Sequence, residues 1–134
     1  PDNLFVAGFL GSPKMNFLDV EVREVRDGAA VVGSGLLKPV ALATGGRPAR
    51  VGQLATLGIR PQYVEVTEAD GGAELAGEVI MTERLGTDTI FDIELSDGTR
   101  MIASLSEDRI FEPGVRAGLS FSAAQAHYFD ETRD

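Results

Sequence analysis

The sequence predicts a mainly β protein, with about nine short strands and one short N-terminal helix in OB-fold-like small barrels. Sixteen of the 134 residues are glycine and six are proline, and a glycine content above the usual ~7% indicates many turns. Apolar and polar residues also alternate with a period of two in several stretches, which is typical of half-buried strands. Strands and helices do not alternate along the chain, so a nucleotide-binding α/β fold is not expected. The strands fit one Greek-key barrel of the OB type, or two barrels that share a core.

The N-terminal residues contain the predicted helix. An Asp-Asn pair near its start can accept hydrogen bonds from the N–H groups of the first turn. Phe5 and Phe9 share one face because they are four residues apart, and Pro13 cannot continue the helix. Chain termini are usually polar, whereas this chain starts on a proline and an apolar segment. We therefore expect the chain to be part of a longer protein.

The segment that follows the helix predicts a hairpin. Leu18, Val20 and Val22 alternate with charged residues, as in a strand with one buried face. Asp27-Gly28 is a turn of the kind that closes short hairpins. Residues 29–32 then form the return strand.

Shorter strands are predicted in the middle of the chain. Residues 33–52 are rich in glycine and proline, and we expect a short strand and a surface loop there. Residues 54–59 form a strand that stops before Pro61. Residues 63–66 predict a further strand or an extended edge.

The second half of the chain has the clearest strand pattern. Residues 75–83 predict a strand with Val79 and Met81 on one face and Glu78 on the other. The Asp-Gly sequence within residues 96–99 is a strong hairpin signal. Three further segments complete the predicted strands: residues 89–95, 101–105 and 119–123.

The charge of the chain argues against a nucleic-acid partner. The net charge is −9 at pH 7 and the pI is about 4.5, and an acidic surface repels phosphate groups. A protein that binds single-stranded nucleic acid needs basic residues interleaved with aromatic residues. In this sequence the basic residues are scattered and do not interleave with aromatic residues. The chain has no cysteine, which excludes disulfides and thiolate metal sites.

No set of residues predicts an active site. His127 is the only histidine, so a multi-histidine metal site is excluded, and a packed or sheet-edge residue is expected. The serines lack the nucleophile-elbow pattern, and no phosphate-binding loop is present. Carboxylates gather at residues 65–74 and 107–112 without EF-hand spacing, and we expect them to lie in solvated turns. We therefore predict no catalytic residue, no cofactor site and no metal site within the chain.

Four motifs follow one another in order: NLFVAGFLGSPKMNFL at 3–18, LGIRP at 57–61, GEVIMTERLGTDT at 77–89 and HYFD at 127–130. Together they closely resemble the C-terminal regulatory region of ATPase subunits of carbohydrate ABC importers, the maltose and glycerol-3-phosphate type, with its transport-associated OB (TOBE) module. The resemblance covers nearly all of residues 1–134. Gln62 and Tyr128 depart from it, since the family usually has Glu and Leu at these positions.

The resemblance implies a non-catalytic regulatory and dimerisation domain. The parent protein would be an ABC transporter ATPase whose upstream nucleotide-binding domain holds ATP and Mg²⁺, and none of the motifs of that domain is in this sequence. The parent would form a homodimer with permease subunits on the cytoplasmic face of the plasma membrane. In some members the region also receives an inhibitory partner protein.

An alternative is a stand-alone module that binds a small oxyanion such as molybdate, because related modules use the same kind of barrel. The hydroxyl groups of GTDT at residues 86–89 offer some of the donors that an oxyanion needs. The net charge of −9 and the presence of only two lysines argue against this alternative.

The candidate residues are expected to pack or to form an interface. The resemblance implies that residues 1–15 form a helix that links the upstream nucleotide-binding domain to the barrel, and this helix is expected to place Phe5 and Phe9 on the barrel or on a partner subunit. Met15, Asn16 and Phe17 enter the first strand, and Arg60 lies in the LGIRP motif.

Overall fold

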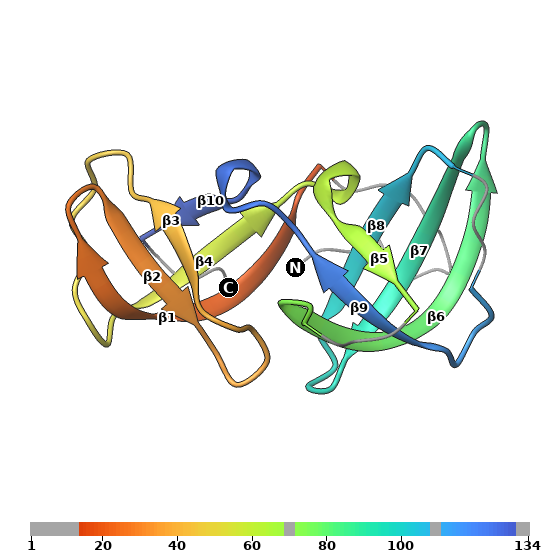
Figure 1. The fold of residues 1–134 in the computed structure, drawn as a ribbon, viewed down its shortest axis with the longest axis horizontal. Helices are drawn as coiled ribbons and strands as arrows, with labels where there is room; N and C mark the ends of the chain where they lie inside the picture. Colours follow the sequence, from red (N-terminus) through yellow and green to blue (C-terminus); the bar gives the residue numbers. More distant parts are fainter. Residues whose placement is uncertain (1–13, 69–71, 108–110, 131–134) are drawn as a thin grey trace.

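The computed structural model describes residues 14–68, 72–107 and 111–130, which contain ten strands and two short 3-10 helices. The first five strands are β1 (Asn16–Arg26), β2 (Ala29–Gly33), β3 (Val40–Ala43), β4 (Leu54–Ile59) and β5 (Glu65–Thr67). The other five are β6 (Leu75–Leu85), β7 (Asp88–Leu95), β8 (Arg100–Leu105), β9 (Arg116–Ser120) and β10 (His127–Phe129). The 3-10 helices are η1 (Pro61–Tyr63) and η2 (Ala123–Gln125). The strands form two curled sheets that lie side by side (Figure 1).

The first barrel is built from the antiparallel sheet β10-β4-β1-β2-β3. The alternating burial of β1 places Leu18, Val20 and Val22 inside it, as the sequence predicts. The hairpin turn at Asp27-Gly28 is confirmed, and Gly28 has the positive φ of 74° that this turn requires. The edge strands β10 and β3 contact each other, so the sheet curls into a barrel.

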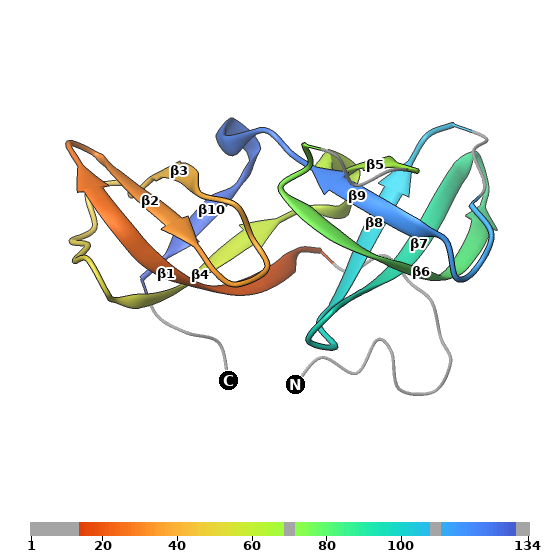
Figure 2. The ribbon, with the colours of Figure 1, turned by 60° about the horizontal axis from the view of Figure 1, so that its bottom comes forward.

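The second barrel is built from the antiparallel sheet β5-β9-β6-β7-β8, whose edge strands β5 and β8 contact each other. Its residues are inserted between β4 and β10. The chain therefore leaves the first barrel after β4, completes the second, and returns to place β10 beside β4 (Figure 2). Because of this return, the first barrel is built from two separate segments of the sequence, whereas the second barrel is one continuous segment.

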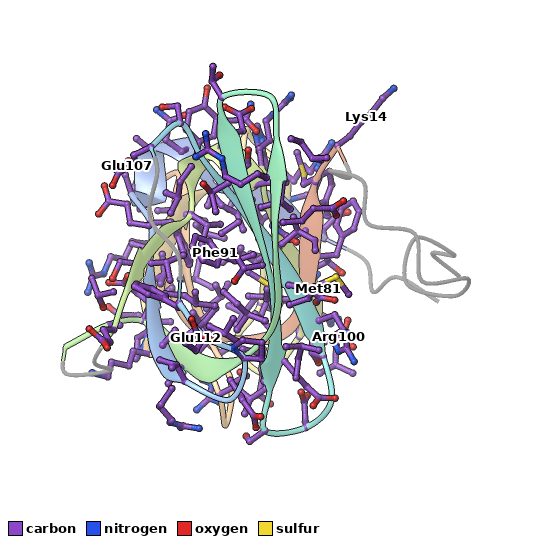
Figure 3. The ribbon with its side chains drawn as sticks, turned by 90° about the vertical axis from the view of Figure 1, so that its right-hand side faces the viewer. Lys14, Met81, Phe91, Arg100, Glu107 and Glu112 are labelled. Atoms are coloured by element: carbon purple, nitrogen blue, oxygen red, sulfur yellow. The ribbon has the colours of Figure 1, made fainter. Side chains whose placement is uncertain are left out.

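The two barrels share one hydrophobic core. Buried apolar side chains from both sheets belong to a single packed cluster, which includes Val22, Leu42 and Leu57 of the first barrel and Phe91 and Leu119 of the second. Figure 3 shows Phe91 in the interior of the second barrel. The prediction of OB-fold-like barrels is confirmed, in the form of two barrels with a common core.

The structure contradicts the prediction that Met81 lies on the same face of β6 as Val79. The register with β7 shifts between Val79 and Met81, so that strand β6 carries an extra residue there. Val79 is fully buried, whereas 38% of Met81 is exposed. The bulge turns Met81 to the outer face, where Figure 3 shows it beside Arg100.

The last predicted strand also differs from the structure. Strand β9 ends at Ser120, and the hydroxyl group of Ser122 accepts a hydrogen bond from the N–H of Ala124 to start η2. The alternation of apolar and polar residues over 119–123 therefore does not correspond to one strand. Strand β10, which the sequence did not predict, follows η2. Residue 63 likewise belongs to η1, and only residues 65 and 66 of the predicted 63–66 region lie in a strand, β5, which ends at Thr67.

Candidate functional site

The structure places the candidate residues in two regions. Phe5 and Phe9 lie outside the described residues. Met15 and the start of β1, which carries Asn16 and Phe17, lie where the first barrel meets the second, while Arg60 lies on the connection from β4 to η1. The geometry at the start of β1 defines the candidate functional site.

Asn16 joins the two barrels. Its Nδ2 donates to the carbonyl oxygens of Ile102 (2.9 Å) and Ile59 (3.2 Å), and its Oδ1 accepts from the N–H of Ile102 at 2.8 Å. The amide group thus pairs with both backbone groups of Ile102 on β8, as a neighbouring strand would. Only 5% of Asn16 is exposed, and a buried polar group with all these partners is stabilising rather than costly.

A cluster of large side chains surrounds Gly58 on the outer face of the first barrel. Phe17, Gly58 and His127 are paired across β1, β4 and β10. A Cβ added to Gly58 would overlap the Sδ atom of Met15 and approach Cε2 of Phe129 to 2.9 Å. The glycine of the LGIRP motif therefore leaves the space that Met15 and Phe129 fill. The rings of Phe17 and Phe129 pack with their centroids 6.0 Å apart.

Arg60 is exposed and does not belong to this cluster. Its carbonyl oxygen accepts the N–H of Tyr63 at 3.0 Å, which starts η1. Pro61 is buried, and η1 contacts β8. The LGIRP motif thus contains the end of β4 in the first barrel and the start of the connection to the second barrel. Arg60 and Pro61 are parts of this connection.

Glu74 makes a second link between the barrels. Its carbonyl oxygen accepts the N–H of Lys38, in the loop after β2, at 3.1 Å. Its Oε1 accepts the N–H of Phe121 at 3.2 Å. The prediction that Glu74 lies in a solvated turn is therefore wrong. Glu65 and Glu68, from the same predicted cluster, are exposed.

Asp92 is a buried carboxylate that the sequence analysis missed. Its Oδ2 accepts from Nη1 of Arg100 at 2.9 Å, while its Oδ1 is buried with no partner among the described residues. Burial raises the pKa of Asp92, and the nearby Arg100 opposes this effect. Asp92 lies opposite Met81 and Ile102 on the outer face of the second sheet. The sequence predicts a strand over residues 89–95, but it does not predict the burial of this carboxylate.

His127 lies at one edge of the first sheet. Its side chain is exposed on β10, the edge strand of the first sheet, as the prediction of a packed or edge residue allowed. In the part of the chain that the structure describes, no three His, Asp or Glu side chains are grouped to hold a metal ion. Within the same residues, no helix has the length and apolar character needed to span a membrane.

Two family models match the chain. The TOBE domain model matches residues 57–129, and the MalK OB fold domain model matches residues 11–64. The chain belongs to the TOBE domain family. The two matches follow each other along the chain, and the TOBE match includes the second barrel together with β10.

Curated relatives carry the same region. The chain is 34% identical over 134 residues to the maltose/maltodextrin import ATP-binding protein MalK of Aliivibrio fischeri, and the match covers 96% of this chain and 35% of the relative. It is 34% identical to the multiple sugar-binding transport ATP-binding protein MsmK of Streptococcus mutans, with 97% and 35% covered. It is 35% identical to the xylose/arabinose import ATP-binding protein XacK of Haloferax volcanii, with 100% and 35% covered. The chain spans about a third of the length of these relatives.

A solved structure shares the fold. The cytoplasmic molybdate-binding protein ModG, crystallised with molybdate bound, superimposes with a TM-score of 0.73. The match covers 87% of this TOBE chain and 96% of the ModG chain at 14% sequence identity. By its two family matches, the chain corresponds to the TOBE and OB region of the MalK-type relatives, a non-catalytic region that is separate from their ATPase domain.

Proposed function

We propose that this TOBE region is the regulatory and dimerisation part of the ATP-hydrolysing subunit of an ABC importer for sugars or related solutes. The observation that carries the proposal is the order of the two family matches. The MalK OB fold model and the TOBE model together extend from residue 11 to residue 129. The relatives that match over nearly all of this chain are import ATP-binding proteins for sugars.

The proposed role is mechanical. Two subunits that open and close on ATP need a region that keeps its shape while the nucleotide-binding domains move. The shared core, Asn16 and Glu74 join the two barrels through buried or half-buried contacts. A pair of barrels that is fixed in this way moves as one body, and supports an interface whose geometry does not change with the nucleotide state.

The proposed partners follow from the same role. A second copy of the parent protein would form the homodimer, and permease subunits would contact the parent through its nucleotide-binding domain. A regulatory protein would bind this region in those importers that have one. ATP and Mg²⁺ would be held by the nucleotide-binding domain, and nucleic acid is not a partner. The parent would lie in the cytoplasm, on the inner face of the plasma membrane.

The test begins with the reading frame upstream of the codon for Pro1. We expect it to encode a G-x-x-x-x-G-K-[ST] loop and an ABC signature, and the intact protein to hydrolyse ATP. The deletion of residues 1–134 should leave the nucleotide-binding motifs in place. A reading frame that starts within a few codons of Pro1, or one without these motifs, would contradict the proposal.

The alternative function is that of an oxyanion-binding module, and the fold of ModG is the observation that favours it. At 14% identity this likeness concerns the fold alone. The net charge of −9 opposes the approach of an anion. Isothermal titration with molybdate, sulfate and phosphate tests the alternative, and tight binding of any of them would favour it over the importer role.

A further inference from the structure

A cavity of about 550 Å³ lies between the two barrels. Its walls come from the start of β1, the loop after β2, the start of β6 and the β7–β8 hairpin. Figures 1 and 2 both show the loop after β2 near the start of β6 and the β7–β8 hairpin. The volume falls within the range of ~300–1,000 Å³ that is usual for small-molecule sites. Because both barrels contribute walls, a ligand here would touch both.

The chemistry of the walls excludes anions. Among the described residues that line the cavity, none is basic, and two are the carboxylates Asp19 and Asp97. Hydrogen bonds from the side chain and backbone of Thr99 hold the pKa of Asp97 below its usual range. Asp97 is therefore ionised at neutral pH, and an oxyanion in this cavity would meet negative charge without a compensating cation.

Both polar and apolar groups line the cavity. The Oγ of Ser34 accepts the N–H groups of Leu36 (3.1 Å) and Leu37 (3.0 Å), so its hydroxyl proton remains to be donated. Phe17 and Leu36 are half-buried and offer apolar surface between the polar groups. The carboxylates accept several hydrogen bonds each. A ligand that matches these walls has many hydroxyl groups and also patches of C–H surface.

We propose that this cavity binds a neutral, hydroxyl-rich ligand of the saccharide class. Asp19 and Asp97 would accept hydrogen bonds from its hydroxyl groups, Ser34 would donate one, and Phe17 would pack on its C–H surface. Both carboxylates are exposed, so an organic cation gains little from them because such ion pairs remain solvated. The choice of saccharides rests on the proposed importer function, and binding would give that region a way to sense the solute inside the cell.

The test is a titration of the ¹⁵N-labelled 134-residue chain, followed by the backbone amide signals. The probes are maltose, xylose and arabinose, with putrescine and molybdate as the competing classes. We expect at least one of the saccharides to shift the amides of Gly35, Leu36 and Thr99. An absence of shifts with all three saccharides would overturn the proposal, as would shifts at these amides with putrescine or molybdate alone.

Two variants locate the binding. A Cβ added to Gly35 meets no atom within 4 Å, so Gly35→Tyr can fold and place a ring at the cavity, and it should abolish the shifts. Asp97→Asn keeps an oxygen for the N–H of Thr99 but loses the charge, and should weaken saccharide binding about fivefold. Asp27→Asn makes the same change in the other Asp-Gly hairpin, away from the cavity, and should bind as the unchanged chain does. Equal binding by the unchanged chain and Gly35→Tyr would overturn the proposed location.

The outcome is independent of the importer role. If no saccharide binds, the proposed importer function is unaffected, because the reading-frame and ATP-hydrolysis experiments test it separately. If the chain binds saccharides but the full protein has no ATPase domain, the cavity remains a saccharide site. It would then have no role in regulating an importer.

Discussion

At the scale of single residues, Asn16 explains how two small barrels behave as one unit. Its side chain satisfies both backbone groups of Ile102 and the carbonyl group of Ile59. Asn16→Ala removes these bonds and leaves buried groups unpaired, so we expect the free energy of unfolding to fall by about 2–4 kcal/mol. Urea denaturation measures the change. Asp19→Ala, at an exposed position of the same strand, should stay within about 0.5 kcal/mol, and an equally small effect of Asn16→Ala would contradict this role.

Tyr128 differs from Asn16 because its buried polar group has no partner among the described residues. Only 4% of Tyr128 is exposed, and its hydroxyl oxygen is buried. Tyr128→Phe removes a buried polar atom that makes no hydrogen bond within the described residues, so we expect the free energy of unfolding to rise by about 1 kcal/mol. Thermal denaturation is the measurement, and a clear loss of stability would show that the hydroxyl group has a partner.

Arg100 and Asp92 predict a pH dependence. Burial raises the folded-state pKa of Asp92 above its usual value of 3.8, so the folded state binds the proton more tightly and Asp92 stabilises it less as pH rises above about 4. Arg100→Met removes the cation, which raises this pKa further. We expect the variant to lose about 1–3 kcal/mol at pH 7 and much less near pH 4, as measured by urea denaturation.

The control for this prediction is the double variant Asp92→Asn with Arg100→Met. It has no buried carboxylate, so its deficit should not grow between pH 4 and pH 7. A deficit of Arg100→Met that is the same at both pH values would mean that Asp92 is not the group responsible.

At the scale of elements, the close approach of β6 and β7 depends on Gly77. A Cβ there would lie 2.7 Å from the carbonyl oxygen of Glu94 and 2.8 Å from Cγ2 of Ile93. Because a backbone atom cannot move aside cheaply, Gly77→Ala should cost about 1–3 kcal/mol. Gly35→Ala meets open space and should be neutral or slightly stabilising. Chemical denaturation of the two variants compares them, and equal stabilities would contradict the crowding.

The strands that the sequence predicts are those with local signals. Alternation identified β1, and Asp-Gly turns identified both hairpins, because period and turn chemistry are properties of neighbouring residues. The bulge that turns Met81 outward and the return of β10 to β4 depend on partners far along the chain. The sequence makes Asn16 a candidate interface residue, but the interface that it makes in this structure is with β8 of its own chain. The burial of Asp92 was missed because its neighbours across the sheet, Met81 on β6 and Ile102 on β8, are distant in the sequence.

At the scale of the whole molecule, the proposed role is that one body made of two barrels holds two subunits together. The shared core and the insertion of the second barrel between β4 and β10 favour such a body, because separating the barrels would expose apolar side chains that are now buried. The proposed sensor cavity lies between the barrels, where it does not interrupt this role.

Sedimentation equilibrium of the intact native protein, with and without residues 1–134, tests this account most directly. Without nucleotide, we expect the intact protein to be a dimer and the version that lacks this region to be a monomer. Dimers of equal strength in both versions would show that the nucleotide-binding domains alone hold the subunits together, and would contradict the proposed role of this region.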